Sequence, residues 1–289
     1  IADWHSLTTH PHPGDVTANV RKILSEYLAC GIDPEKAAIY VQSDVKEVLE
    51  LYLYLNMNAY LGELQRVTSF KEKARKQPEN VNAGLLTYPT LMAADILIHR
   101  ADKVPVGKDQ EQNMEMARKF ARRFNTIYGV EFFPEPQSYS FGGDAIKVPG
   151  LDGSGKMGKS EGNAIYLIDD AATIRKKVMK AVTDSGPTQP NSEKPEAIAN
   201  LFTMLKIVSS ADTYDYFNEK YNACEIRYGD LKKQLAEDIV NFTSPIRERI
   251  LAYAADTEYM DKVAREGAEK ARASADKTIR EVRKIIGFN

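Results

Sequence analysis

The sequence predicts an α/β protein in which a doubly wound parallel sheet is combined with an inserted or following all-helical domain. Strand and helix patterns alternate up to residue 168, and almost only helical patterns occur from Ala171 to Ile286. Such alternation is typical of a parallel sheet covered by helices, and the change after Asp169 indicates a domain boundary. With 289 residues, of which 43% are hydrophobic, the chain is long enough for one large domain or two moderate ones.

Predicted helices and strands alternate in the first half of the chain. A helix follows the N-cap residue Asp15 and stops at Gly31, because apolar residues between them recur at helical spacing. Next come a short buried strand over 38–41, a helix over 45–61, an exposed basic loop over 71–78, a helix over 88–99, a strand over 103–106 and a helix over 109–124.

Three parts are therefore expected. Residues 1–168 form a Rossmann-like domain, residues 169–255 form a helical domain, and residues 256–289 form a C-terminal helix that packs back on the first domain.

The net charge excludes no class of partner, whereas the cysteine content indicates a cytoplasmic protein. The formal net charge of −2 gives no sign of a nucleic-acid partner, although a local basic face would be enough for one. Cys30 and Cys224 are far apart and neither belongs to a C-x-x-C pair, which is typical of reduced cysteines in a cytoplasmic protein. No apolar run has the length of a membrane span, so no membrane association is expected.

The segment Lys156-Met-Gly-Lys-Ser160 places two lysines three residues apart in a glycine-rich loop. Two ammonium groups on such a loop suit the binding of a polyphosphate whose charge shifts during a reaction. The stretch Gly153–Ser160 also fits the P-loop pattern G-x-x-x-x-G-K-[ST], which would indicate an NTPase or kinase.

The context of this lysine loop favours the first interpretation. A P-loop opens a helix, so that helix N–H groups hold the phosphates. Here a turn at 161–163 and a short apolar run at 164–168 follow instead, and Pro149-Gly150 precedes. A solvated loop without chemistry is the remaining alternative.

One predicted helix carries an acid on an apolar face. Tyr88, Met92, Asp95 and His99 are spaced by four, three and four residues and so share one side. Asp95 is either a core acid satisfied by a neighbouring amide or basic side chain, or the acceptor for one N–H donor on an apolar ligand. An aromatic amino acid with a ring N–H would fit the second interpretation.

A second group of polar residues follows the strand at 103–106. Gly107, Asp109 and Gln110 come where that strand ends and a helix opens, and in an open parallel sheet ligands bind at this edge. Gly107 would allow a close backbone approach, Asp109 would bind ribose hydroxyls and Gln110 an amino group. Asp109 as a simple helix cap is the alternative.

These motifs together resemble the bacterial-type tryptophanyl-tRNA synthetases of class I. The resemblance rests on Gly84–Ile98, Val104–Gln110, Ala121–Asn125 and the lysine loop, and it extends over essentially the whole chain, including Ala181–Ser185 and Glu266–Ala271. The lysine loop is similar to the lysine-methionine-serine-lysine-serine loop of that class.

The resemblance implies a role for each matching residue. Asp95 would accept the indole N–H, Met92, Val104 and Val106 would line the slot for the ring, Tyr88 and Gln110 would hold the α-amino group, and His5 would lie at the pocket floor. The ATP site would comprise Gly107, Lys108, Asp109, Val148, Lys156, Met157, Gly158, Lys159 and Ser160, with Lys156 and Lys159 as the catalytic pair.

The resemblance also implies an activity and partners. L-Tryptophan and ATP, with Mg²⁺, would form tryptophanyl-adenylate and pyrophosphate, and the acyl group would pass to tRNA(Trp). The protein would be a homodimer whose helical domain, 169–255, reads the anticodon. Arg175-Lys-Lys177 and Lys180 are the residues most suggestive of phosphate contact.

Two departures from the family pattern are expected to matter. Ile1-Ala-Asp3 resembles the tail of a strand, so the first strand and the histidine-glycine signature of the family are expected ahead of this chain. Gly158 replaces a serine in the lysine loop, which adds flexibility and removes a hydroxyl donor. A P-loop enzyme and a non-catalytic tryptophan- or RNA-binding paralogue remain the alternatives.

Overall fold

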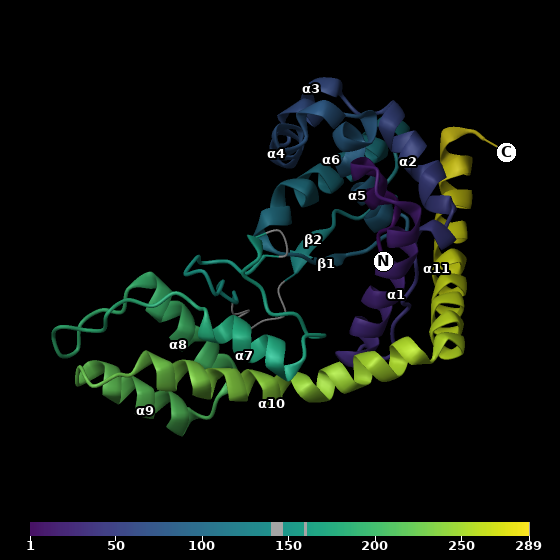
Figure 1. Ribbon diagram of the computed structural model, residues 1–289. Helices are drawn as coiled ribbons and strands as arrows, with labels where there is room; N and C mark the ends of the chain where they lie inside the picture. The colour runs from purple at the N-terminus through teal and green to yellow at the C-terminus, as the bar shows by residue number, and fades with distance from the viewer. Residues whose placement is uncertain (140–146, 159–160, 289) are drawn as a thin grey trace. The chain divides into compact units, whose positions relative to one another are not determined.

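The structure is a computed structural model that describes residues 1–139, 147–158 and 161–288, with only the backbone of Lys108. It divides into two compact units (Figure 1). The first unit comprises Ile1–Ala145 and Asp256–Asn289, and the second comprises Ile146–Ala255. Each is described by itself.

Two parallel strands and a helix form the βαβ unit of the first unit. Strand β1 (Lys103–Pro105) pairs with β2 (Gln137–Tyr139), and Lys103 lies opposite Gln137. Helix α6 (Glu111–Tyr128) connects the two strands and ends where Gly129 takes a left-handed conformation. The predicted α/β class with a parallel sheet is thus confirmed, with two strands in the described part of the chain.

The other elements of the first unit are helical (Figure 1). They are η1 (Trp4–Thr9), α1 (Pro13–Ala29), η2 (Gln42–Asp44), α2 (Glu47–Met57), α3 (Leu61–Arg66), α4 (Thr68–Lys76), η3 (Pro78–Asn80), α5 (Ala83–Leu97), η4 (Lys108–Gln110) and α11 (Thr257–Ile286).

Helix α5 lies at the centre of this unit. Asn82 caps it by accepting a hydrogen bond from the Leu85 amide at 3.0 Å. The helix contacts α2, α4, α6 and η1. Its apolar side joins the main core, whose largest fully buried members include Leu51, Leu55, Leu97, Ile98, Met114 and Phe120.

Helix α11 belongs to the first unit, where it contacts α1 and α2 (Figure 1). A Cβ atom at Gly267 would lie 2.6 Å from the Ile39 carbonyl carbon and 2.9 Å from its nitrogen, closer than real Cβ contacts. The helix backbone therefore packs directly on the backbone of the segment 38–41, and only glycine fits there.

Three local predictions for this unit were wrong. The segment 38–41 is extended but is not a strand, because Tyr40 O accepts one backbone hydrogen bond from Ile1 N and the next bond to Ile1 comes from Gln42 N, just after the segment. The expected loop 71–78 is largely helix α4. The cap of α1 is His12, and Asp15 lies in the first turn.

The second unit is helical. It contains α7 (Ala171–Met179), α8 (Glu196–Val208), α9 (Ala211–Asn222) and α10 (Tyr228–Ala255) (Figure 1). The side chains of Asp170 and Ser210 cap α7 and α9. Each accepts a hydrogen bond from the backbone amide three residues further along, at Thr173 and Thr213. The core of this unit includes Ile174, Leu201, Leu205, Tyr221, Leu231 and Leu235.

The compact units divide between 145 and 146, whereas the sequence placed the boundary after 168. Residues 147–158 and 161–170 join the helical unit because Leu151 is buried in its core and Met157 and Ile165 pack against that core. The boundary at 255 coincides with the predicted one.

Candidate active site

Asp95, on α5, lies within hydrogen-bond distance of two side chains from other segments. Gln42 Nε2 donates to both carboxylate oxygens at 2.8 Å, and His5 Nε2 lies 3.1 Å from Oδ2. The Asp95 side chain is 28% exposed. The acid thus has internal partners, as the first interpretation expects, and also reaches the surface.

The carboxylate of Asp95 retains capacity for another donor. An ionised carboxylate offers about four lone-pair positions. Gln42 and His5 occupy at most three of them. One acceptor position is therefore left for an N–H group of a ligand.

The tautomer of His5 follows from its neighbour. The ionised carboxylate of Asp95 only accepts, so His5 Nε2 carries the proton. His5 Nδ1 is buried and has no hydrogen-bond partner in the described part of the chain.

Tyr88 packs between His5 and a lysine. The Tyr88 ring meets the His5 ring edge-on at a centroid distance of 4.4 Å. Lys73, on α4, places its Nζ atom 3.5 Å from the centroid of the Tyr88 ring. Burial lowers the pKa of the Lys73 ammonium and raises the pKa of the Tyr88 phenol. Tyr88, Asp95 and His5 thus form one cluster.

The apolar residues predicted for the ring slot lie in the same unit. Met92, Val104 and Val106 are partly buried and pack against the main core. Their place between the core and the surface is the one that a wall of an apolar ligand slot requires.

His99 continues the face of Asp95 by one helical turn. Its Nε2 is 2.9 Å from the Tyr40 hydroxyl, and its Nδ1 is 3.2 Å from Ser274 Oγ on α11. Burial lowers the pKa of His99 and, with the charge of Asp95, raises the pKa of Tyr40 to about 12. His99 therefore has a structural role that ties α5 to α11.

The segment after β1 is held by a chain of side-chain amides. Gln110 Nε2 donates to Asp109 Oδ2 at 3.0 Å, and Asn113 Nδ2 donates to Gln110 Oε1 at 2.9 Å. Asn113 is buried. A Cβ atom at Gly107 would lie 2.6 Å from Asp109 Oδ1, so a larger residue there would make the aspartate side chain shift.

The lysine loop, in the second unit, is organised by Asn163. Its Nδ2 atom donates to Asp152 Oδ1, Ser154 Oγ and the Lys156 carbonyl at 2.9–3.0 Å, and its Oδ1 accepts from the Gly158 amide at 2.9 Å. Hydrogen bonds from Ser154 and Asn163 lower the pKa of Asp152. The buried carboxamide thus fixes the backbone on both sides of Met157. Lys159 and Ser160 lie outside the described residues.

The residues after the lysine loop do not have the geometry of a P-loop. Glu161 has 3-10 conformation, residues 162–170 form turns and irregular segments, and the next α-helix, α7, begins only at Ala171. No helix N-terminus in this described stretch can therefore hold a phosphate next to the loop. The P-loop alternative is not supported.

Val148 and Met157 contribute to an apolar hollow of about 210 Å³ in the second unit. Val148 is largely exposed, and its carbonyl accepts a hydrogen bond from the Met157 amide. The other lining residues come from 165–167, α8 and α10, namely Ile165, Leu167, Met204, Ile207, Val208, Ile239, Phe242 and Thr243.

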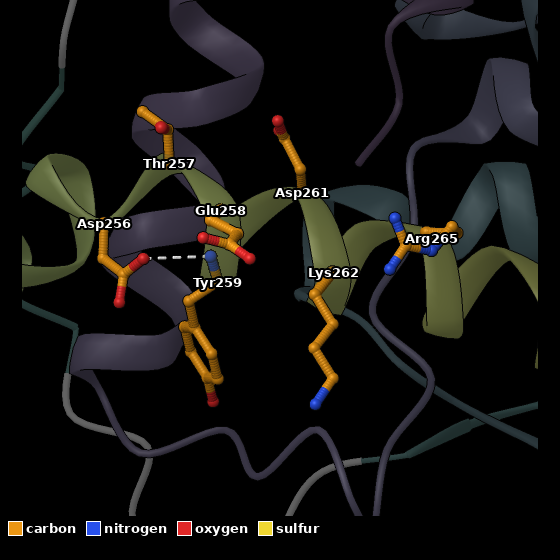
Figure 2. A pocket seen from close by; sticks show the side chains of 7 residues that line it. All are labelled: Asp256, Thr257, Glu258, Tyr259, Asp261, Lys262 and Arg265. Carbon is orange, nitrogen blue, oxygen red and sulfur yellow. Dashed lines mark hydrogen bonds between the residues drawn. The ribbon is translucent and has the colours of Figure 1, made fainter.

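A larger hollow of about 670 Å³ lies at the start of α11 (Figure 2). Asp256 caps the helix by accepting from the Tyr259 amide, as the dashed line shows, and Asp261 pairs with Arg21. Its lining is charged and comes from the first turns of one helix. None of the predicted site residues lines it.

Two of the four basic residues suggested for phosphate contact are already paired. Arg175 forms two hydrogen bonds with Glu237 at 2.7 and 2.8 Å, and Lys177 binds Asp169 at 2.5 Å. Their ammonium and guanidinium groups are thus engaged within the second unit. Lys176 and Lys180 are the better candidates.

Three positions were missed from the sequence: Gln42, Asn113 and Asn163. Gln42 contacts Asp95 from 53 positions away, and no local signal in the sequence could have found it. Asn113 lies one helical turn after Gln110, which is the spacing for side-chain contact. Asn163 lies in a stretch that was interpreted only as a turn.

Neither a membrane helix nor a metal cluster is found in the described ranges. No helix there has both the length and the apolar character of a membrane span. No group of three or more histidine, cysteine or acidic side chains there could hold a metal ion. Cys30 and Cys224 are free and exposed.

A family model and several known proteins match this chain. The model "tRNA synthetases class I (W and Y)" matches residues 1–244. A tryptophan–tRNA ligase of Porphyromonas gingivalis is 78% identical over 288 residues, covering 100% of this chain and 88% of that protein. One from Listeria monocytogenes is 40% identical over 292 residues, covering 100% and 86%.

A solved structure has the same fold. The crystal structure of tryptophanyl-tRNA synthetase from Campylobacter jejuni, complexed with ADP and tryptophan, superposes with a TM-score of 0.88 at 32% identity. The match covers 100% of this chain and 88% of that one.

Proposed function

Because the chain belongs to the class I tRNA synthetases for tryptophan and tyrosine, we propose that the cluster around Asp95 binds L-tryptophan and that the lysine loop binds the phosphates of ATP. The chain activates L-tryptophan with ATP and transfers the tryptophanyl group to tRNA. The observation that carries this function is the similarity, over the whole chain, to tryptophan–tRNA ligases.

Asp95 is the proposed acceptor for the indole N–H. Its free acceptor position beside Gln42 and His5 supports this role. Tyrosine and phenylalanine have no ring N–H, so either would leave a buried acceptor unpaired. Unpaired groups of this kind discriminate by about 10⁴–10⁵-fold in a site built to hydrogen-bond its substrate.

The remaining tryptophan contacts are proposed from residues of the same unit. Met92, Val104 and Val106 line the slot for the ring, and Tyr88 and Gln110 hold the α-amino group. Gln110 Oε1 accepts one hydrogen bond from Asn113 and has a second lone pair for an ammonium group.

ATP is the second substrate. We propose that Gly107, Lys108 and Asp109 bind its ribose, that Val148 contacts the nucleotide, and that Lys156 to Ser160 close over its phosphates. The lysines would stabilise the charge that passes to pyrophosphate, and loss of one such preorganised donor costs on the order of 2–4 kcal/mol in the transition state.

Mg²⁺ fits this site through the nucleotide. Magnesium at such sites is usually held by substrate phosphates, waters and one or two carboxylates, so no protein cage is needed. Asp109 is a carboxylate among the proposed site residues, and Mg²⁺ would neutralise phosphate charge when bound.

The first step is a displacement at the α-phosphorus. A carboxylate oxygen of tryptophan bonds to that phosphorus as the bond to the bridging oxygen breaks, and pyrophosphate leaves with the electron pair. The substrate is already a carboxylate, so the protein supplies position and charge rather than a base. A terminal ribose hydroxyl of tRNA(Trp) then attacks the acyl carbon, and AMP leaves.

We also propose a cytoplasmic homodimer that reads the anticodon with residues 169–255. An exposed apolar stripe on α2, formed by Leu49, Leu53 and Met57 at intervals of four residues, supports a contact between two copies. Sedimentation of the protein and of a Leu53→Glu variant tests this, and a monomeric parent protein would refute it.

Amino-acid-dependent pyrophosphate exchange with the full-length protein tests the function. We expect exchange with tryptophan, little with tyrosine, and a raised tryptophan KM in Asp95→Ala. Asp261→Ala, which removes an exposed acid of the same unit, is the matched control and should behave like the parent. Equal exchange with tyrosine, or none with tryptophan, would refute the proposal. Release of ADP instead of AMP would select an NTPase.

A further inference from the structure

We infer that Gln42 is a positioning residue that fixes the carboxylate of Asp95 and so determines selection of the indole ring. The inference rests on the proposed function, in which Asp95 accepts the indole N–H. Gln42 is only 4% exposed and touches both oxygens of the acid.

The orientation of the Gln42 amide is determined by its neighbours. Its Nε2 donates to Asp95, and its Oε1 accepts from the Trp4 amide at 3.1 Å. A flipped amide would place an oxygen against the carboxylate and an NH₂ group against an N–H donor, which is unfavourable at both ends. Gln42 therefore can only donate to Asp95.

The backbone around Gln42 is held equally firmly. The Gln42 amide donates to the Ile1 carbonyl at 2.8 Å, and Asp3 Oδ1 accepts from both Trp4 N and Ser43 N at 3.0 Å. The donor is thus fixed at the start of η2 by residues of η1 and of the segment before it. Its position does not depend on the rotamer of Asp95.

A fixed donor that contacts both oxygens sets the plane of the carboxylate. Without it, Asp95 could rotate toward His5 or toward solvent, since its side chain is partly exposed. Binding of an indole N–H would then include the cost of ordering the acceptor. Gln42 removes that cost in advance, which is how a supporting residue makes a binding group selective.

This role differs from packing because Gln42 acts through Asp95. The two residues should therefore show coupling: once Asp95 no longer presents a carboxylate, the loss of Gln42 should matter little. A residue that only fills space would destabilise both backgrounds equally.

Gln42→Met removes the donor and keeps most of the volume. In pyrophosphate exchange we expect the tryptophan KM to rise about 10- to 100-fold, the value of a hydrogen bond to a charged group, with the ATP KM and kcat nearly unchanged. Discrimination between tryptophan and its benzothiophene analogue, which has sulfur in place of the N–H, should narrow. Gln234→Met, which removes an exposed amide-to-carboxylate bond to Asp238, is the matched control.

Gln42→Glu keeps the acceptor for the Trp4 amide and provides a readout that packing would not change. Two facing carboxylates share one proton, so the tryptophan KM should rise with pH and approach that of the parent at acid pH. This variant decides the question if Gln42→Met does not fold, which fluorescence of Trp4, the only tryptophan, would show.

Asp95→Ala and the double variant Asp95→Ala/Gln42→Met separate the two hypotheses, because alanine removes the acceptor altogether. A raised KM in Asp95→Ala that does not increase further in the double variant supports the inference. Additive effects, or an unchanged KM in Gln42→Met, would overturn it while the proposed function stands. An unchanged KM in Asp95→Ala would overturn the proposed tryptophan site itself.

Discussion

Replacement of Gly267 by alanine should destabilise the first unit, although alanine is the better helix former. Gly267 lies in the interior of α11, and an added Cβ would come within 3.0 Å of three backbone atoms of Ile39. Backbone atoms cannot turn aside as a side chain can. Helix α11 and the segment 38–41 would have to separate.

The size of the effect follows from two opposing terms. Overpacking of this kind costs about 1–3 kcal/mol, and a clash with backbone belongs at the upper end. Alanine in place of glycine returns about 1 kcal/mol of helix propensity. The net loss is therefore about 2 kcal/mol, which for a unit of this size lowers the melting temperature by about 4–8 °C.

Trp4 makes the measurement specific to the first unit. It is the only tryptophan, so its fluorescence during urea unfolding follows the unit that contains Gly267. The control is Gly62→Ala in α3 of the same unit, where an added Cβ would meet only Arg66 Nη1 at 3.6 Å, an ordinary contact, and stability should not fall. If Gly267→Ala unfolds at the same urea concentration as the parent, the backbone contact between α11 and Ile39 does not exist.

Three further outcomes are expected. Asn163→Ala should lower the rate of adenylate formation up to about 100-fold, the effect of misplacing a reacting group, and should leave the tryptophan KM unchanged in pyrophosphate exchange. Asn113→Leu should raise the tryptophan KM about 5- to 10-fold through misorientation of Gln110, and an unchanged KM would exclude that link. Because burial raises the pKa of Tyr40 to about 12 from 10.0, its neutral form stabilises the fold fully below pH 10, and this stability is lost as the pH rises to about 12. Tyr40→Phe should flatten that alkaline loss in urea unfolding, and an identical pH profile would contradict it.

Local sequence patterns predicted those elements whose structure depends on neighbouring residues. The apolar run around Met92 predicts α5. Spacings of four, three and four residues bring Tyr88, Met92, Asp95 and His99 to one side. The glycines around the lysine loop predict an irregular segment. The alternation of strand and helix predicted a parallel sheet and its strand at 103–106, but not the second strand, β2.

Local sequence patterns failed where contacts with residues far along the chain determine the structure. The charged segment 71–76 is helical because Gln112, far along the chain, caps Thr68 N at 2.7 Å and because Lys73 packs on Tyr88. The extended segment 38–41 is not a strand because a single backbone hydrogen bond, from Ile1 N to Tyr40 O, joins it to Ile1. The contact of Gln42 with Asp95 joins residues 53 positions apart, and no local signal specifies it.

The sole indole of the chain has a practical consequence. Trp4 lies next to Gln42 through its backbone amide, so growth of the producing cells on fluorotryptophan would place a single ¹⁹F nucleus at the edge of the site. Its chemical shift would report ligand binding and changes in protonation near Gln42, and no other ¹⁹F signal from the chain would overlap it.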